Sequence, residues 1–232
     1  MRVGIMQPYF LPYIGYWQLI QAVDVFVVYD NIKYTKKGWI NRNRFLLNGQ
    51  DAVFSLPLRK DSDFLNVNER DLAESFNREE LLNRFREAYR RAPLHCEAMR
   101  LLETIIRHPG SNLFDYIFHS IRSVCDHLGV KTRLVVSSSL LCDHSQKSAE
   151  RVLGICRALG ASEYVNPIGG TELYSKHEFA EQGLRLNFLK SRDFNYPQGN
   201  HAFVPWLSIL DVMMFNSRDR IREELAQGYT LT

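Results

Sequence analysis

A segment early in the chain combines basic and aromatic side chains, the residue types that hold phosphates and flat rings. Its members are Lys33, Tyr34, Lys36, Lys37, Trp39, Arg42 and Arg44. A guanidinium can bind a phosphate through two parallel N–H bonds, and an aromatic ring can stack on a base or a sugar. We therefore predict that Lys33, Trp39, Asn41 and Arg42 bind an anionic substrate. A solvated basic loop is the alternative, because runs of charge usually face water.

Three titratable side chains in polar segments are candidates for catalysis. Asp30 directly follows an apolar run, where its carboxylate could bind a hydroxyl or a metal ion. Asp193 and His201 occur in a segment with proline and glycine that is too polar to form a core element. Imidazole side chains suit general acid–base work at neutral pH, which makes His201 the best-placed of the three for that role. We predict catalytic roles for His201, Asp193 and Asp30.

Near the N-terminus, Tyr13-Ile-Gly15-Tyr16 follows a predicted strand and a proline turn and opens a helix. This is the layout of the nucleotidyltransferase His-x-Gly-His signature, in which the glycine lets a nucleotide approach. Both histidine positions are tyrosine here, and a phenol can donate to phosphate but carries no positive charge. The pattern predicts either a nucleotide site or an aromatic helix start that packs on the sheet.

Two glycines follow another predicted strand in Asn166-Pro-Ile-Gly169-Gly170. Their backbone could cradle an anion at a helix N-terminus, or they could form a plain turn. Lys147, at a predicted helix start, could reach a phosphate or could be surface charge. The full set of predicted substrate-binding residues is Gln7, Tyr9, Tyr13, Gly15, Tyr16, Lys33, Trp39, Asn41, Arg42, Lys147, Gly169, Gly170, Tyr196 and Gln198.

The cysteines are scattered, with no Cys-x-x-Cys pair. Cys125 with His127, and Cys142 with His144, could together form a zinc site, but each histidine is closer to its cysteine than structural zinc sites use. We therefore predict no metal site among the side chains. The cofactor stays unknown, and magnesium carried with a nucleotide is one alternative.

Length and composition limit the class of protein. The chain has 232 residues, 45% of them hydrophobic and 24% charged, which suits one α/β domain with a sizeable core. No apolar run is long enough to span a bilayer, and the N-terminus lacks the pattern of a signal peptide, so we expect a cytoplasmic protein without membrane insertion. A net charge of +3 is too small to indicate nucleic-acid binding. We expect a small-molecule ligand, and the oligomeric state is left open.

Strand and helix patterns alternate in both the N-terminal and the C-terminal parts of the chain. The expected strands are 2–7, 25–29, 133–137, 162–165 and 184–188, and the expected helices are 15–22, 147–159, 175–182 and 207–215. This alternation indicates a mostly parallel, Rossmann-like sheet with helices on both faces. Asn48-Gly49 supplies the turn of a predicted β-hairpin.

Residues 69–128 read as helical, with Asn77 as an N-cap and Glu80 as its capping-box partner. We predict that they form a helical insertion into an α/β domain made of 1–68 and 129–232, the whole being one compact unit.

The ends of the predicted strands locate the site. In an open parallel sheet, ligands bind outside the carboxyl ends of the strands. That rule selects residues 7–16, 30–44, 166–171 and 193–201, which are rich in polar, aromatic and glycine residues. We expect these four segments to lie together.

Several of these segments resemble one known family. The strings Met6-Gln-Pro-Tyr-Phe-Leu-Pro-Tyr-Ile-Gly-Tyr16 and Lys37-Gly-Trp-Ile-Asn-Arg-Asn-Arg44, with Asp30 between them, are similar to the WbqC-like family of bacterial proteins. The Gly169-Gly170 turn, Tyr196-Pro-Gln198 and Ser208-Ile-Leu-Asp211 also look like that family. The family name comes from gene clusters for O-antigen and other surface polysaccharides. The resemblance implies a role in making or decorating nucleotide-linked sugars.

Three functions follow from these observations. The leading one is a cytoplasmic transferase that acts on a nucleotide-activated amino sugar, for example by acyl or aminoacyl transfer. The second is nucleotidyltransferase-like phosphate chemistry at the helix start around Gly15. The third is a non-catalytic scaffold of the polysaccharide machinery whose helical insertion binds a partner. The third requires an exposed apolar patch that includes Leu81, Phe85, Phe114 and Phe118.

Overall fold

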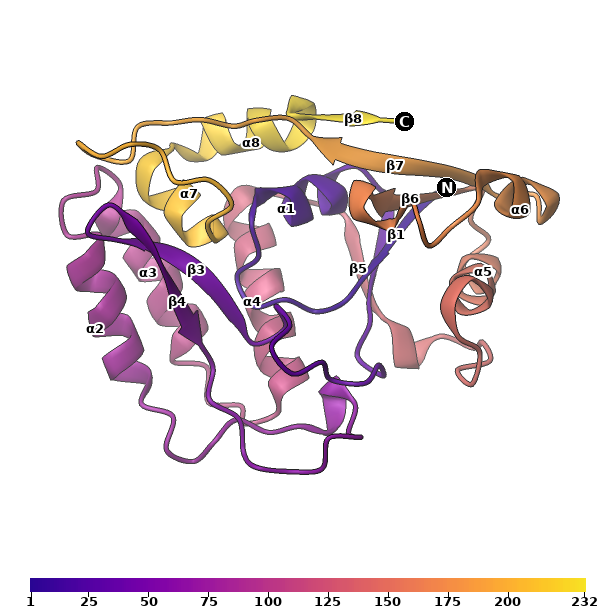
Figure 1. Ribbon diagram of the computed structural model, residues 1–232, viewed down its shortest axis with the longest axis horizontal. Helices are drawn as coiled ribbons and strands as arrows, with labels where there is room; N and C mark the ends of the chain where they lie inside the picture. The colour runs from indigo at the N-terminus through magenta and orange to yellow at the C-terminus, as the bar shows by residue number, and fades with distance from the viewer.

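A six-stranded sheet forms the centre of the fold in the computed structural model, which describes all residues, 1–232 (Figure 1). The strand order is β5-β2-β1-β6-β7-β8. The strands are β1 (Arg2–Met6), β2 (Val25–Val28), β5 (Arg133–Val136), β6 (Glu163–Pro167), β7 (Arg185–Ser191) and β8 (Tyr229–Leu231). All neighbours pair in parallel except β7 and β8, which are antiparallel. The predicted α/β class with a mostly parallel sheet is confirmed.

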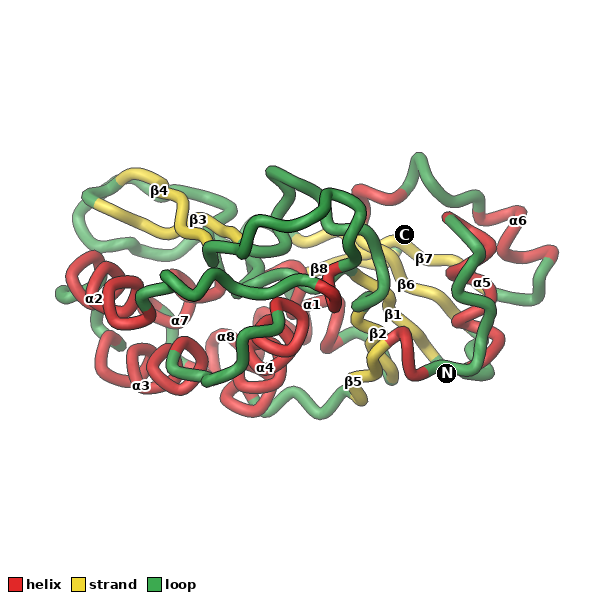
Figure 2. The backbone as a smooth tube through the Cα atoms, turned by 90° about the horizontal axis from the view of Figure 1, so that it is seen from below, coloured by secondary structure: helices red, strands yellow, loops and turns green.

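Alternate residues of the central strands enter two different apolar cores. Val3 and Ile5 of β1 are buried in one core, whereas Phe26 and Val28 of β2 are buried in the other. The first core is covered by α5 (Ser148–Ala158) and α6 (Lys176–Glu181); the second by α1 (Ile14–Gln21), α4 (Leu113–Leu128), α7 (Ile209–Phe215) and α8 (Arg218–Gln227). Figure 2 shows the sheet between α5 and α6 on one side and α4 and α8 on the other. The strands are therefore buried on both faces, as their continuous apolar runs predict.

The predicted hairpin consists of β3 (Arg42–Leu47) and β4 (Gln50–Ser55). Asn48 and Gly49 at its turn have φ values of 52° and 77°, the left-handed conformation that tight hairpin turns require. Phe45 and Phe54 of the hairpin are buried and pack edge-to-face on Phe85 of α2 (Arg78–Ala88), with ring centroids 5.4 and 5.0 Å away. Aromatic packing thus ties the hairpin to the helices.

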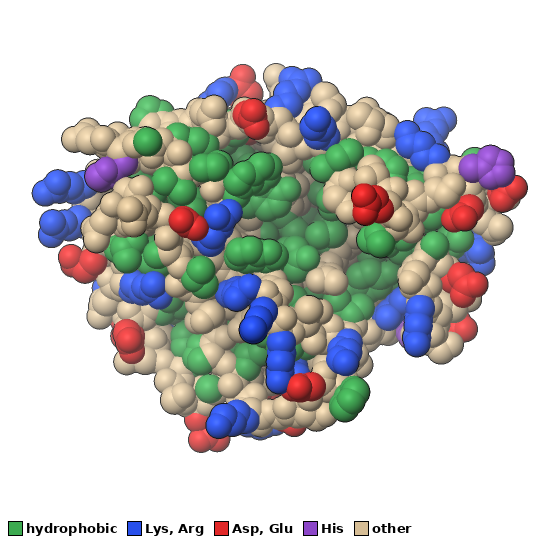
Figure 3. Space-filling view, in the orientation of Figure 1, with side chains coloured by type: hydrophobic (Ala, Val, Ile, Leu, Met, Phe, Trp, Pro, Cys, Tyr) green, Lys and Arg blue, Asp and Glu red, His purple; other side chains and the backbone are tan.

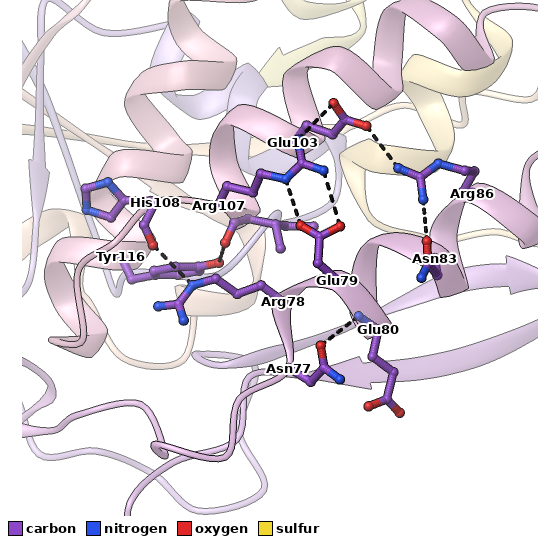
Figure 4. A network of polar contacts seen from close by, with 11 residues as sticks. Asn77, Arg78, Glu79, Glu80, Asn83, Arg86, Glu103, Arg107, His108 and Tyr116 are labelled. Carbon is purple, nitrogen blue, oxygen red and sulfur yellow. Dashed lines mark hydrogen bonds and ion pairs between the residues drawn. The ribbon is translucent and has the colours of Figure 1, made fainter.

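Helix α2 lies against α3 (His95–Ile106), and ion pairs join their outer faces (Figure 4). Arg107, just after α3, makes two bonds to the carboxylate of Glu79, at 2.8 and 3.2 Å. Arg86 of α2 reaches Glu103 of α3 at 3.0 Å. Exposed pairs of this kind contribute about 0–1 kcal/mol each, so they orient the two helices more than they stabilise them.

The boundaries of some elements differ from the prediction. Residues 69–77 are not helical beyond the end of the 3-10 turn η1 (Val67–Glu69). Helix α2 begins at Arg78, and the side chain of Asn77 caps it by accepting the backbone N–H of Glu80 at 3.1 Å. Helix α8 and strand β8 have no predicted counterpart. Only Ile221 and Leu225 of α8 are buried, which leaves little hydrophobic periodicity to detect.

Helices α2, α3 and α4 share one continuous core with α1, α7 and α8. Leu81, Phe85 and Phe114 are buried in it, and Phe118 is half-buried against it. The apolar patch required for a partner surface on these helices is therefore largely part of the core. No helix has the length and apolar character needed to cross a membrane.

Candidate functional site

The carboxyl ends of β1, β2, β6 and β7 meet at one edge of the sheet because these strands run parallel. The segments that follow them lie beside a hollow in the molecular surface. Figure 3 shows hydrophobic side chains lining this hollow, with lysine and arginine side chains gathered below it. Three hollows lie near this edge and the adjoining hairpin, and two of them adjoin each other.

The first hollow, here called the aromatic cleft, has a volume of about 200 Å³. Its lining residues are Tyr9, Pro12, Tyr13, Trp39, Asn43, Arg44 and Trp206. Trp39 and Trp206 are 44% and 59% exposed, although tryptophan is one of the larger apolar side chains. Two exposed indoles that line one hollow with an arginine form a surface suited to a ring that is attached to an anionic group.

The indoles of the cleft are held in different ways. The guanidinium groups of Arg42 and Arg44 lie 5.2 and 5.9 Å from the Trp39 ring centroid. Trp206 meets Tyr13 edge-to-face at 5.6 Å, and its backbone carbonyl accepts Nη2 of Arg44 at 3.1 Å. Trp206 has a φ of 61°, a left-handed conformation that is costly for a bulky residue. Neighbouring contacts must therefore hold the Trp206 backbone in place.

A second hollow of about 250 Å³ adjoins the aromatic cleft and shares Tyr13 and Trp206 with it. Asp193 lines this second hollow. Its side chain is exposed and makes no hydrogen bond or ion pair within the chain. A free carboxylate therefore lies next to the cleft, where it can accept a proton from a bound nucleophile.

His201 lies in a third hollow, of about 600 Å³, together with Arg90, Arg91 and Gln198. Its ring packs on the hairpin turn, where a Cβ added to Gly49 would lie 2.6 Å from the imidazole. None of the residues that line this hollow lines the aromatic cleft or the second hollow. The structure therefore places His201 and Asp193 in different hollows.

Asp30 is 3% exposed and bonded on both carboxylate oxygens. Oδ1 accepts the hydroxyl of Ser137 at 2.8 Å and the backbone N–H of Ser138 at 2.9 Å, and Oδ2 accepts the side-chain amide of Asn68 at 2.9 Å. Burial acts to raise the pKa of Asp30, but the bonds from Ser138 and Ser137 outweigh it and hold that pKa below its usual value. Asp30 therefore bonds within the chain, to Ser137, Ser138 and Asn68. The three predicted catalytic residues, Asp30, Asp193 and His201, do not lie together.

Asn41 and Arg42 also bond within the chain. Oδ1 of Asn41 accepts the hydroxyl of Tyr34 at 2.8 Å, and its amide donates to the carbonyl of Leu56 at 2.7 Å. Nε of Arg42 donates to the carbonyl of Gly38 at 2.8 Å, and Nη2 donates to the carbonyl of Lys37. These bonds fix the shape of the loop that carries Trp39, and none of them reaches Asp30.

Arg44, rather than Arg42, is the guanidinium that lines the cleft, and it is absent from the predicted substrate-binding set. Arg42 and Arg44 lie two residues apart on β3, so their side chains leave the same face of the strand. That spacing is the sequence signal that could have selected Arg44 together with Arg42.

The Tyr13–Tyr16 segment packs largely on itself and on Gln7. The buried phenol of Tyr16 donates to the backbone carbonyl of Gln7 at 3.0 Å, and the phenol of Tyr9 donates to the side chain of Gln7 at 3.3 Å. A Cβ added to Gly15 would lie 2.4 Å from the Tyr13 hydroxyl, so the ring of Tyr13 fills the space above this glycine. Tyr9 and Tyr13 line the cleft, whereas Tyr16 supports them from within the core.

Lys33, Lys147, Gly169 and Gly170 line none of the three hollows, whereas Tyr196 lines the second. Gly170 accommodates Asn166, whose Nδ2 would lie 1.7 Å from an added Cβ, whereas Gly169 faces open space. Lys147 is exposed at the start of α5, and Lys33 lies over the ring of Phe64 at 4.7 Å. The glycine turn therefore has a packing role at Gly170.

The cysteine–histidine pairs do not assemble, and the chain contains no group of three or more His, Cys, Asp or Glu side chains placed to hold a metal ion. Cys125 is buried on α4, and burial raises the pKa of its thiol to about 12. Cys142 lies at the core on the other face of the sheet, with its sulfur 3.8 Å from Nδ1 of His144.

Asp211, on α7, has no predicted role but organises two of the predicted residues. It is fully buried, and its carboxylate accepts the phenol of Tyr196 at 2.7 Å, the amide of Gln198 at 2.7 Å and the phenol of Tyr89 at 2.9 Å. Burial raises the pKa of Asp211, and these bonds oppose the rise without cancelling it. A single charge inside the apolar run of α7 is the sequence signal for such a network.

Comparisons with known proteins agree with the family resemblance that the N-terminal sequence indicates. The chain is 27% identical over 218 residues to the uncharacterized protein Rv1507c of Mycobacterium tuberculosis, and the match covers 93% of each chain. No solved structure matches the chain. The WbqC-like protein family matches residues 7–223, which include the cleft, the hairpin and the helices. The chain therefore belongs to the WbqC-like protein family.

Proposed function

We propose that this protein is a transferase that takes part in the synthesis of bacterial surface polysaccharides. It binds a nucleotide-activated amino sugar in the aromatic cleft and transfers an acyl or aminoacyl group to that sugar. The observation that carries the proposal is the presence of Trp39 and Trp206 in one cleft with Arg44. Exposed indoles stack on sugar and base rings, and a guanidinium binds phosphate. The family's link to surface-polysaccharide gene clusters agrees with such a ligand.

The two adjoining hollows suit the two partners of a transfer reaction. The ring and phosphates of the activated sugar occupy the aromatic cleft, and the reactive end reaches the second hollow past Tyr13 and Trp206. There the carboxylate of Asp193 accepts the proton of the sugar amine as its nitrogen attacks the acyl carbonyl carbon. The bond between that carbon and its carrier then breaks, and the carrier leaves with the electron pair. His201 lies outside this path.

The two alternative functions have weaker support. Phosphate chemistry at the helix start needs free donors, but the Tyr16 hydroxyl is bonded to a backbone carbonyl and the space above Gly15 is filled. A scaffold role needs an exposed apolar face on the helical insertion, but Leu81, Phe85 and Phe114 are buried.

A melting-temperature survey tests the proposal. The protein is heated with each member of a panel of nucleotides and nucleotide sugars, and the expected result is a raised melting temperature with at least one nucleotide amino sugar. Ligand at 100 times its Kd stabilises the folded state by about 2.7 kcal/mol. No shift with any member would contradict the proposal.

The same survey separates binding from chemistry. Asp193→Asn should keep the shift in melting temperature and lose transfer of the acyl group, followed as a mass increase of the sugar. Asp219→Asn, an exposed carboxylate on α8, is the matched control and should keep both. Full transfer by Asp193→Asn would remove Asp193 from the mechanism.

A further inference from the structure

One segment contributes to all three hollows. Residues 192–208, here called the cleft loop, connect β7 to α7. They place Trp206 in the aromatic cleft, Asp193 in the second hollow, and Gln198 and His201 in the third. The position of this loop therefore sets the shape of every candidate binding surface.

The cleft loop has very few polar attachments. Between Asp193 and Pro205, no backbone N–H or carbonyl of the loop bonds to another element. Two side-chain hydrogen bonds leave this stretch, one from Tyr196 and one from Gln198, and both end on Oδ2 of Asp211. A single carboxylate oxygen is therefore the polar anchor of thirteen consecutive residues, 193–205.

Gln198 connects Asp211 to the part of the cleft loop that lies next to Trp206. Its Oε1 accepts the backbone N–H of Val204 at 2.7 Å, and its Nε2 donates to the Val204 carbonyl at 3.1 Å as well as to Asp211. Val204 is two residues from Trp206, whose backbone is in a conformation that bulky residues avoid. A chain of hydrogen bonds thus runs from Asp211 through Gln198 to the wall of the cleft.

A buried carboxylate with no cation beside it carries a high desolvation cost. Asp211 is fully buried and forms no ion pair, and all of its donors are neutral. An apolar residue would avoid the desolvation cost, and an asparagine would turn an N–H toward donors. Only an acceptor with two oxygens satisfies Tyr89, Tyr196 and Gln198 together.

We infer that Asp211 is the positioning residue of the site, whose carboxylate holds the cleft loop so that Trp206 and Asp193 face the bound ligand. The placement of the loop stands on the geometry alone, whereas the effect on ligand binding rests on the proposed function.

Limited proteolysis of the unliganded protein tests the placement. Chymotrypsin cleaves after aromatic residues that do not precede proline, and the loop offers Phe194, Phe203 and Trp206. Asp211→Asn should raise the rate of cleavage within 193–206 by roughly tenfold or more, because bonds to a charged acceptor are lost. Tyr89→Phe is the control: it removes the donor of Asp211 that lies outside the loop, together with the acceptor of the Leu46 N–H, and should leave this cleavage at the wild-type rate.

The outcomes separate positioning from general destabilisation. Equal loop cleavage in Asp211→Asn and Tyr89→Phe, at a temperature where both are folded, would overturn the inference. Should Asp211→Asn fail to fold, Gln198→Ala gives the same comparison, because it removes one anchor and the clamp on Val204 while leaving Asp211 in place. Unchanged cleavage in Gln198→Ala would likewise overturn it.

Binding of a nucleotide sugar links the anchor to the cleft. With UDP-N-acetylglucosamine as the probe, Asp211→Asn should weaken binding by roughly tenfold, and Tyr89→Phe should bind as the wild type does. Wild-type affinity in Asp211→Asn, despite a loosened loop, would overturn the link between loop and ligand. Failure of the wild type to bind this probe and the wider panel would contradict the proposed function, and the proteolysis result would still decide the placement.

Discussion

The two tryptophans of the aromatic cleft are carried by loops that are held in opposite ways. The loop with Trp39 is bonded to other segments on both sides of the indole: the N–H of Tyr34 donates to Leu65 at 3.1 Å, and the carbonyl of Ile40 accepts from Phe10 at 2.9 Å. The cleft loop with Trp206 has no such backbone bonds between residues 193 and 205. The loop with Trp39 is therefore bonded to other segments through its backbone, whereas residues 193–205, which precede Trp206, have one carboxylate oxygen as their polar anchor.

Two buried aspartates in the segments around the cleft differ in pKa: Asp30, which follows β2, and Asp211, which anchors the cleft loop. Asp30 is 3% exposed and Asp211 is 0% exposed, but Asp211 lies deeper in the protein and loses more of its solvation. Asp30 accepts hydroxyl and backbone donors from the 3-10 turn η2 (Ser137–Ser139), and its pKa is lowered. Asp211 accepts two phenols and an amide, and its pKa is raised because desolvation outweighs them. The depth of burial and the donor set together decide whether a buried carboxylate favours its charged form.

The largest expected effect comes from replacing each aspartate by asparagine. Asp30→Asn should lower the free energy of unfolding at pH 7 by about 2–3 kcal/mol, because bonds to a carboxylate that favours its charged form are lost. Asp211→Asn should lower it by about 1 kcal/mol, because removal of a costly buried charge offsets part of the lost bonding. Urea unfolding of both variants checks the order. An equal or larger loss in Asp211→Asn would contradict the comparison.

A smaller effect is expected from Arg42, which bonds within the loop that carries Trp39. Arg42→Lys loses the planar guanidinium that donates to the carbonyls of both Gly38 and Lys37. The free energy of unfolding should therefore fall by about 1 kcal/mol. Affinity for a nucleotide sugar should change less than it does on loss of Trp39. Unchanged stability with strongly weakened binding would instead assign Arg42 to a phosphate.

The smallest effect is a pH dependence with opposite signs for the two aspartates. The pKa of Asp211 is raised on folding, so its protonation stabilises the folded state, and the stability of the wild type relative to Asp211→Asn should rise as the pH falls from 7 toward 4. The pKa of Asp30 is lowered, so the stability of the wild type relative to Asp30→Asn should fall as the pH drops through the folded pKa. Urea midpoints from pH 7 to below pH 4 measure both slopes, because the loss at Asp30 begins only near the ordinary carboxyl pKa. Slopes of the same sign would refute the assignment.

Much of the fold is predictable from local pattern. The continuous apolar run at Val25–Val28 indicates a strand buried on both faces, and the Asn48-Gly49 pair indicates the hairpin turn. Helix α8 and strand β8 escape detection because their burial depends on neighbours distant in sequence. For example, the carbonyls of Glu224 and Gly228 accept the side-chain amide of Gln18, more than two hundred residues away.

The site is less predictable than the fold. The rule that ligands bind beyond strand ends selects the segments that form the cleft, including Tyr13 and Trp39. It does not say which polar side chains face the ligand and which bond within the chain. Asp30, Arg42 and Gln198 all look like ligand-binding residues in the sequence, but their partners are contacts that only the folded chain creates.

The most direct test of the account is the affinity of the aromatic cleft for its ligand. The ligand that raises the melting temperature most is titrated by calorimetry into Trp39→Ala, Trp206→Ala and Leu173→Ala, the last being an exposed apolar residue that lines none of the three hollows. Stacking on an aromatic ring contributes about 1–3 kcal/mol, so each tryptophan variant should bind roughly tenfold or more weakly, and Leu173→Ala should bind as the wild type does. Wild-type affinity in both tryptophan variants would contradict the claim that this cleft is the binding site.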